Sequence, residues 1–477
     1  MELLKEISRE GARGYTLPSL DVEDVPLEEI FPDSHLRERL HMIEVSEVEV
    51  VRHFSNLSSL NYHIDKGIYP LGSCTMKYNP KINEDVSRFE NFTSLHPYTN
   101  DEYVQGALQI MYELEKSLGE LTGFKDVSLQ PAAGAHGELL GLLLMRAYHK
   151  KRGNINKKKI LIPDSAHGTN PASSTRAGFV AAKIPSNDEG ILTPDIVNKN
   201  VDEDVAGLMI TNPNTLGIFE PYIGEIADIL HKHDALLYMD GANLNALMGY
   251  FRPGDVGVDI LHFNLHKTFS TPHGGGGPGG GASGVSDKLV PFLPVPRVVK
   301  SEEKFKLDYN YPDSIGKILG FYGHFSVMVK AYAYIRMLGT KGLKRATEQA
   351  VINANYLREI LKDYYDLPYK NRCMHEFVLS GDIQKANGVR TLDIAKKILD
   401  YGLHAPTIYF PLIVSEALMI EPTETEPKWV LDKFSEVMIE IAKKAENSPE
   451  ELKNAPVNTP IKRLDEAKAA RELDVHW

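Results

Sequence analysis

The chain has 477 residues, a formal net charge of −12 and 42% hydrophobic residues, which suits a globular protein of about three folding units. The acidic excess disfavours wholesale binding to nucleic acid or anionic membranes. No apolar run approaches the roughly 18 residues of a membrane span, and the charged start MELLKEISRE lacks a signal peptide's apolar stretch. We therefore expect a cytoplasmic protein. Two cysteines, Cys74 and Cys373, are too few for a disulfide framework, so we expect reduced thiols.

The chain divides into three predicted parts. Residues 1–105 are repeatedly interrupted by proline and predict an extended N-terminal segment that wraps its own domain or a partner subunit. Residues 106–320 predict a large domain. Residues 321–477 predict a smaller C-terminal α/β domain followed by a charged tail.

Short apolar runs alternate with helical stretches in the large domain. We expect helices over 137–151 and 222–233, and strands around 160–163, 179–184, 208–211, 236–239 and 259–263. This alternation predicts an α/β fold with a mostly parallel sheet covered on both faces. Ligands of such sheets bind at the carboxyl ends of the strands, so the polar residues there are the candidates for a site.

The C-terminal part predicts a second set of helices and strands. We expect helices from about Phe325, over 343–362, over 391–401 and over 427–445, and strands over 374–379, 408–414 and 417–421.

Lys267 follows the last predicted strand of the large domain and precedes a run with seven glycines in residues 274–281. A lysine where a strand meets the loops can be the imine-forming residue of a pyridoxal-phosphate (PLP) enzyme, although a lysine after a strand is more often a plain surface residue. Asp240 ends the preceding strand and could keep the cofactor's ring nitrogen protonated. Its alternative role is to cap the next turn.

Two further stretches supply what a PLP site needs. Small residues before the helix at 137–151 allow close backbone approach to a phosphate, which the helix N-terminus attracts: Ala133, Gly134, Ala135 and His136. His167, after the strand at 160–163, could stack on the cofactor ring or be a structural histidine. The order of phosphate loop, stacking residue, aspartate and lysine, each at a strand end, favours the PLP interpretation.

At these residues the sequence resembles the P-protein family of the glycine cleavage system, in its two-subunit form. The resemblance rests on YPLGSCTMKYNP (69–80), DSAHGTNPA (164–172), NLHKTF (264–269), HGGGGPG (273–279) and ALMIEPTETE (417–426). It implies PLP fold type I, with a large domain built on a seven-stranded type of sheet, and Lys267 as the cofactor lysine. It also implies glycine decarboxylation, with transfer of the aminomethyl group to the oxidised lipoyl arm of H-protein.

The resemblance extends to partners and to further residues. It implies a subunit 1 that lacks the lysine, and an α2β2 heterotetramer. It also places Ser73, Cys74 and Thr75 at the substrate, although Cys74 could equally be an inert buried thiol.

Other candidate residues rest on position alone. Thr211 and Asn212 end a strand and could contact the cofactor's phenolic oxygen, with a turn as the alternative role of Asn212; Asn243 follows Asp240. His266 beside the lysine is a candidate for proton handling, but neighbours on an extended segment point in opposite directions.

Four other interpretations compete. The glycines at 274, 276 and 279 satisfy GxGxxG, but Pro278 interrupts the motif and no suitable helix follows, so we expect a loop that lets the substrate approach. A metal site from His262, His266 and His273 is another alternative, because the i to i+4 spacing of the first two would align them on a helix. The segment is predicted as strand and loop and contains no HExxH motif, so we expect no metal site. A noncatalytic subunit would lack Lys267. Another PLP enzyme, such as an aminotransferase or a desulfurase, is the nearest alternative.

Overall fold

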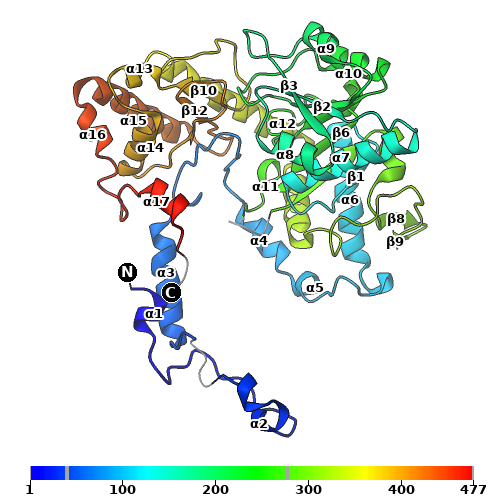
Figure 1. The fold of residues 1–477 in the computed structure, drawn as a ribbon, viewed down its shortest axis with the longest axis vertical. Coiled ribbons are helices and arrows are strands. Elements are labelled where there is room, and N and C mark those ends of the chain that lie inside the picture. The colour runs from blue at the N-terminus through cyan, green and yellow to red at the C-terminus, as the bar shows by residue number, and fades with distance from the viewer. Residues whose placement is uncertain (1, 38–41, 274–278, 475–477) are drawn as a thin grey trace. The chain divides into compact units, whose positions relative to one another are not determined.

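The computed structural model describes residues 2–37, 42–273 and 279–474 (Figure 1). Residues 1–66 and 67–477 form two compact units. The prediction that 274–278 form a loop lies outside the described residues, and the predicted domain boundaries stay a prediction.

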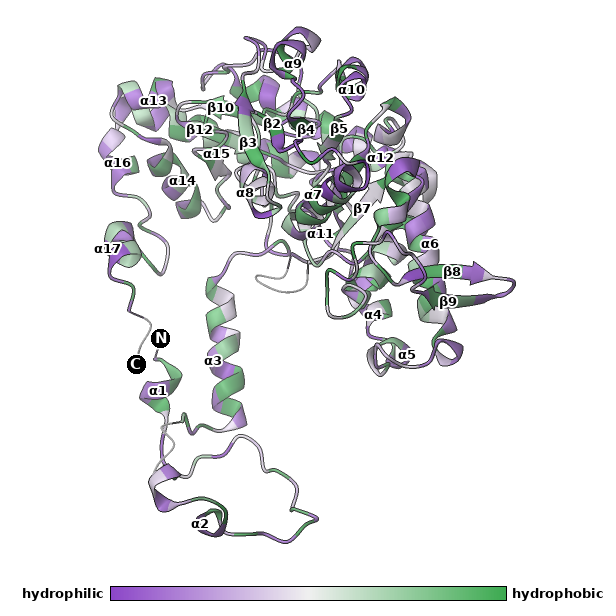
Figure 2. Ribbon diagram, turned by 45° about the vertical axis from the view of Figure 1, so that its right-hand side comes forward, coloured by the Kyte–Doolittle hydropathy of each residue, from purple (hydrophilic) through white to green (hydrophobic). Residues whose placement is uncertain are grey.

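The first unit contains a long amphipathic helix that the sequence prediction missed. Its helices are α1 (Leu4–Ile7), α2 (Leu27–Ile30) and α3 (Glu47–Leu60). Ser46 caps α3 by accepting from the Glu49 N–H, and the Glu49 carboxylate accepts from the Ser46 N–H, which forms a capping box. Apolar and polar residues alternate along α3 in Figure 2, and no residue of this helix is buried. The prolines in residues 1–105 predicted an irregular segment. No proline lies between Pro32 and Pro70, however, so none interrupts α3.

A seven-stranded sheet forms the centre of the second unit, in the order β1-β7-β6-β5-β4-β2-β3. Among these strands, β7 pairs antiparallel with β1 and β6, and the other pairs are parallel. The strands are β1 (Asp126–Ser128), β2 (Lys159–Pro163), β3 (Val180–Ile184), β4 (Val205–Thr211), β5 (Leu236–Asp240), β6 (Ile260–Asn264) and β7 (Gly281–Val285). The predicted mostly parallel sheet is therefore confirmed, and β1 and β7 are the strands that the prediction missed.

The central strands are buried on both faces because each face packs against its own hydrophobic cluster. Along β5, Leu237 and Met239 belong to one cluster, whereas Leu236 and Tyr238 belong to the other. The accompanying helices are α4 (Lys81–Ser87), α5 (Glu90–Thr93), α6 (Gln105–Thr122), α7 (Gly134–Lys151), α8 (Thr169–Arg176), α9 (Pro194–Asn200), α10 (Ile223–Lys232), α11 (Leu265–Thr268) and α12 (Phe325–Leu361). Close packing of α7 on the sheet depends on Gly141, where a Cβ would lie 2.2 Å from the Tyr238 ring.

The C-terminal elements gather in a separate cluster beside the large sheet (Figure 1). A three-stranded antiparallel sheet in the order β10-β12-β11 has strands β10 (Phe377–Ser380), β11 (Thr407–Ile408) and β12 (Ala417–Ile420). Its helices are α13 (Asp382–Ala386), α14 (Thr391–Asp400), α15 (Lys428–Asn447) and α16 (Pro449–Lys453), whereas α17 (Glu466–Arg471) lies apart from them (Figure 1). The predicted strand over 408–414 is wrong beyond Ile408, because a cis Phe410–Pro411 bond and a turn follow.

Two more features complete the second unit. The hairpin β8 (Arg297–Ser301) and β9 (Lys304–Asp308) was not predicted. The helix α12 bends at Gly339, whose φ of 58° separates the two helices that the sequence suggested. None of the described helices is long and apolar enough to cross a bilayer.

Candidate active site

A cavity of about 290 Å³ lies at the carboxyl ends of β4, β5 and β6. The start of α7 and the residues before β10 complete its wall. Its lining is Ser73, Ala133, Gly134, Ala135, Glu138, His167, Thr169, Thr211, Pro213, Thr215, Asp240, Ala242, Asn243, His262, Asn264, His266, Lys267, His375 and Glu376. The edge of the sheet at which the sequence predicted a ligand is therefore hollow.

Lys267 enters this cavity from α11, a single helical turn that begins directly after β6. The prediction of strand and loop holds for β6 and for residues 269–273, but it is wrong for residues 265–268, which form this helical turn. His266 and Lys267 consequently both line the cavity, and the argument that they point in opposite directions does not hold. The Lys267 Nζ donates to the carbonyl oxygen of Ser73 at 2.7 Å, which ties the lysine to the 69–80 stretch.

Asp240 ends β5 with a carboxylate that several donors surround. Oδ2 accepts from the Asn170 amide and Oδ1 from the Ala242 N–H, both at 3.0 Å. His262 Nε2 lies 3.4 Å from Oδ1. Burial alone would raise the pKa of Asp240, but His262 and these two donors outweigh it and hold the pKa below its usual range. Asp240 is thus a buried carboxylate that stays ionised.

Polar atoms without partners face this carboxylate and the rest of the cavity. His262 Nδ1 lies 2.6 Å from the Tyr238 hydroxyl, and Nε2 faces Asp240. The buried Thr211 Oγ1 and Asn264 Oδ1 lack a hydrogen-bond partner. Buried polar groups are almost always paired, so these atoms indicate a polar ligand.

His167 follows β2 and is held by two contacts. Its Nδ1 lies 2.9 Å from Thr169 Oγ1, and its ring packs edge-on against Phe410 with centroids 5.4 Å apart. These contacts fix the plane of an imidazole at the cavity wall.

The trio proposed for a metal does not form one cluster. His266 and His273 stack edge-on with centroids 5.1 Å apart, and burial lowers the pKa of each to about 4. His262 instead faces Asp240. Potential ligand groups meet at two other places within the described residues: Glu138 with Asp240 and His262, and His375 with Glu376 and Glu421.

Four predicted site residues lie outside the lining. His136 Nδ1 accepts from the Ala132 N–H at the start of α7. Asn212 pairs with the backbone of Glu220 on both sides of its amide, which is the turn role that competed with cofactor contact. The Cys74 thiol is mostly buried, and burial raises its pKa to about 11. The Thr75 N–H donates to Glu421 at 2.8 Å.

Sequence reasoning missed several lining residues. Glu138 accepts from the hydroxyls of Thr169 and Ser173 and stands among the apolar residues of α7. His375 and Glu376 precede the apolar strand β10. In the sequence, each of these residues is only a charged or polar residue beside an apolar run. That pattern is too common to identify a site residue.

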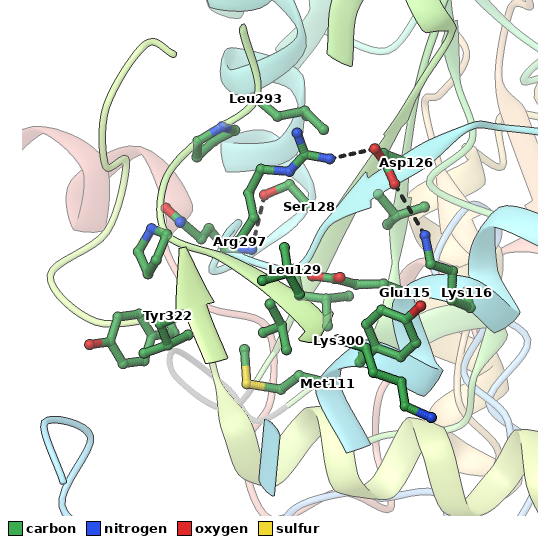
Figure 3. Close-up of a pocket in the computed structure, with 18 residues that line it drawn as sticks. Met111, Glu115, Lys116, Asp126, Ser128, Leu129, Leu293, Arg297, Lys300 and Tyr322 are labelled. Carbon is green, nitrogen blue, oxygen red and sulfur yellow. Dashed lines mark hydrogen bonds and ion pairs between the residues drawn. The ribbon is translucent and has the colours of Figure 1, made fainter. Parts of the chain in front are cut away.

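A second cavity, of about 250 Å³, lies between α6, β1 and β8 and contains none of these groups. Figure 3 shows Asp126 at its wall between Lys116 and Arg297, with Glu115 nearby. Lys267 and Asp240 line the first cavity and not this one, so the first cavity is the candidate active site.

Comparison with known proteins places this geometry in a family. The family model "Glycine cleavage system P-protein" matches residues 15–304, and the model "Glycine dehydrogenase, C-terminal domain" matches residues 346–463. The chain belongs to the glycine cleavage system P-protein family. The resemblance noted in the sequence is thereby confirmed.

Relatives of this P-protein family match over the whole chain. A probable glycine dehydrogenase (decarboxylating) subunit 2 from Caldanaerobacter subterraneus subsp. tengcongensis is 59% identical over 476 residues, covering 100% of this chain and 98% of the relative. The protein of the same name from Aquifex aeolicus is 58% identical over 474 residues, covering 99% and 98%.

A crystal structure of glycine decarboxylase (P-protein) in inhibitor-bound form matches with a TM-score of 0.74 at 20% identity, covering 87% of this chain and 94% of that one. A cysteine desulfurase from Thermococcus onnurineus shares the fold with a TM-score of 0.61 at 17% identity, covering 80% and 97%. The architecture is therefore PLP fold type I, as the sequence predicted.

The residues of the P-protein cavity fit PLP. A lysine amine, an ionised buried carboxylate and an imidazole of fixed plane share one cavity, and α7 starts there with Ala133, Gly134 and Ala135 at its wall. The unpartnered Thr211 and Asn264 atoms add hydrogen-bonding capacity for a polar ligand.

Proposed function

We propose that this chain is the PLP-binding subunit of a glycine dehydrogenase (decarboxylating). It releases carbon dioxide from glycine and passes the aminomethyl group to the oxidised lipoyl arm of H-protein. The observation that carries this proposal is the cavity that unites Lys267 with Asp240 and His167 in a chain of this family.

Each proposed cofactor contact follows from a position in the cavity. Lys267 is the covalent attachment point, and Ala133, Gly134 and Ala135 at the start of α7 hold the phosphate, because a helix N-terminus favours an anion. His167 would stack on the cofactor ring, and the Thr211 hydroxyl would hold the phenolic oxygen. Asn243 lines the wall beside Asp240 and completes this set.

Each residue of the site has its own role in the reaction. Bound PLP supplies an electron sink for the electron pair that remains when glycine loses carbon dioxide. The Asp240 carboxylate holds a proton at the pyridine nitrogen, because its own donors keep it ionised. His266, whose pKa burial lowers to about 4, is neutral at physiological pH and positions groups rather than supplying protons. Ser73 holds the Lys267 amine through its carbonyl oxygen, and Cys74 and Thr75 shape the substrate side behind it.

The names of the relatives support a proposal about the partners of this chain. "Subunit 2" supports a second subunit, and we propose an α2β2 heterotetramer in the cytoplasm that docks lipoylated H-protein. Residues 1–105 are then the segment that reaches other surfaces, residues 106–320 the PLP-binding domain, and residues 321–477 the small domain and tail.

Release of labelled carbon dioxide from carboxyl-labelled glycine tests this function. The chain is purified with its partner subunit and mixed with PLP and lipoylated H-protein. We expect release that requires all components and is abolished in Lys267→Ala. Equal release by Lys267→Ala, or faster release from larger amino acids, would overturn the proposal.

A further inference from the structure

Two buried carboxyl groups, Glu376 and Glu421, meet at the cavity wall and have no part in the chemistry above. Glu376 precedes β10 and Glu421 follows β12, and these strands pair antiparallel with Phe377 opposite Ile420, so both acids lie at one end of the small sheet. Glu376 is 3% exposed and Glu421 is fully buried. An oxygen of each lies within 4.8 Å of the other and of a His375 ring nitrogen. Two like charges this close and this buried do not both ionise, so the pair keeps a proton.

The hydrogen bonds decide which carboxyl group keeps it. Glu421 accepts from the Thr75 N–H at 2.8 Å and from the Asn243 amide at 2.7 Å. Glu376 accepts only the Ser73 N–H among the hydrogen bonds described, at 2.7 Å. Donors stabilise the charged form, so the charge belongs on Glu421 and the proton on Glu376. Burial raises the pKa of Glu376 well above its usual range, and the neighbouring Glu421 raises it further.

The backbone N–H groups of Ser73 and Thr75 each donate a hydrogen bond to one of the two carboxyl groups. Ser73 and Thr75 have φ angles of 65° and 50°, a left-handed conformation that non-glycine residues adopt rarely. Ser73 also links the pair to Lys267, because its N–H donates to Glu376 while its carbonyl oxygen accepts from the Lys267 amine. Strained backbone held in this way is typical of functional sites.

His375 indicates independently that a ligand belongs at this wall. It is 2% exposed and lines the cavity, yet neither ring nitrogen has a hydrogen-bond partner. Nε2 lies 3.6 Å from Glu376 Oε1, which is too long for a hydrogen bond. Burial lowers the pKa of His375 to about 3, so the ring is neutral and does not neutralise the acids.

Resting on the proposed function, we propose that Glu376 and Glu421 share one proton and that Glu376 gives it to the lipoyl sulfur that leaves during aminomethyl transfer. The electron pair freed by loss of carbon dioxide forms the new carbon–sulfur bond, and the pair of the broken sulfur–sulfur bond goes to the other sulfur. That sulfur takes the proton from Glu376. The ammonium group of the next glycine gives up one proton on binding and recharges the pair, so protons and electrons balance over the cycle.

The other titratable groups in or near this cavity are poorer donors. Burial lowers the pKa of His266 and of His273 to about 4, so both rings lack a proton to give near neutral pH. Asp240 is ionised. Burial raises the pKa of the Cys74 thiol to about 11, which makes it a weak acid. The Lys267 amine donates to the carbonyl oxygen of Ser73 rather than to Glu376.

Infrared spectroscopy tests the shared proton without relying on turnover. In the complex of both subunits prepared without PLP, the difference spectrum between wild type and Glu376→Gln at neutral pH should show loss of a carboxylic-acid carbonyl band that shifts in heavy water. Glu421→Gln should keep that band with a lower titration midpoint, because the neighbouring charge is gone. The control Glu440→Gln removes an exposed acid on α15 whose pKa lies below its usual range and should show no such band.

Kinetic measurements test whether Glu376 gives this proton to the leaving sulfur during turnover. We expect Glu376→Gln to lower kcat for H-protein-dependent carbon dioxide release about 100-fold, as for loss of a general acid. Glycine affinity should stay within about threefold and borohydride should still fix PLP on Lys267. Absence of the acid band from the difference spectrum between wild type and Glu376→Gln, or a kcat for Glu376→Gln within about threefold of wild type, would overturn the inference. If Glu376→Gln does not fold, an unchanged titration midpoint in Glu421→Gln would do so. A wild-type complex that shows the band but no glycine-dependent release would instead contradict the proposed function.

Discussion

Asp240 and Glu376 line the same cavity, yet their surroundings act on their protonation in opposite directions. Asp240 receives two hydrogen bonds and faces His262, which together outweigh burial and hold its pKa below the usual range. Glu376 receives one described hydrogen bond and faces a second carboxyl group, so its pKa lies far above that range. Pairs of carboxyl groups whose environments separate their pKa values are how a site obtains both an anion and an acid at one pH.

Glu115, at the wall of the second cavity, offers a pH test of a single side chain (Figure 3). Burial and the neighbouring Asp126 raise its pKa to about 8, even though Arg297 and Lys116 oppose this. The folded protein then binds more protons than the unfolded chain between the unfolded pKa of about 4.3 and pH 8. The stabilisation that Glu115 gives at low pH is therefore lost as pH rises through this window.

We expect Glu115→Gln to flatten this dependence. Unfolding by urea at several pH values should show that the wild type loses up to about 1 kcal/mol more stability per pH unit than the variant between pH 5 and 8. Parallel curves for the two proteins would show that Glu115 titrates normally.

At the scale of elements, the sequence predicted the strands that bear the site. The runs that became β2, β4, β5 and β6 are short, apolar and separated by helices, and burial on both faces requires such runs. The positions of Asp240 and Lys267 followed, because strand ends of a parallel sheet share one edge. The elements that were missed carry weaker patterns: β7 is GASGV, in which small residues hide the alternation, and β1 has only three residues.

The carboxyl pair escaped prediction for a different reason. Glu376 and Glu421 come together through the antiparallel pairing of β10 with β12, and no local pattern gives that register. The turn at Asn212 was foreseeable as an alternative, because AsnProAsn favours turns, but the choice between its two roles required the hydrogen bonds to Glu220.

For the second unit as a whole, Lys77 connects parts that are distant in the sequence. Its amine donates to the Thr268 carbonyl oxygen beside the active-site lysine at 2.7 Å, to Asn245 after β5, to the Tyr334 hydroxyl on α12 and to Glu424 after β12. The side chain is 1% exposed, and that of Glu424 is 9% exposed. Burial would lower the pKa of Lys77, but Glu424 and Tyr334 outweigh it, so the amine stays charged.

Lys77→Met should therefore strongly destabilise the protein. It leaves a largely buried carboxylate unpaired, which costs about 3–5 kcal/mol of unfolding free energy. The double variant Lys77→Met with Glu424→Gln should lose less than the sum of the two single variants. Lys151→Met, which removes an exposed ion pair with Asp313, is the control and should change stability by less than about 1 kcal/mol. Urea unfolding measures all four variants, and a loss below about 1 kcal/mol for Lys77→Met would contradict the connecting role.

The account depends most on Lys267 as the residue that carries the cofactor. Reduction of the PLP-loaded complex with borohydride, followed by proteolysis and mass mapping, measures this directly. We predict one pyridoxyl-labelled peptide on this chain, with the added mass on Lys267 and none in Lys267→Ala. A label on another lysine, or no label on a complex that has bound PLP, would contradict the assignment of the active site.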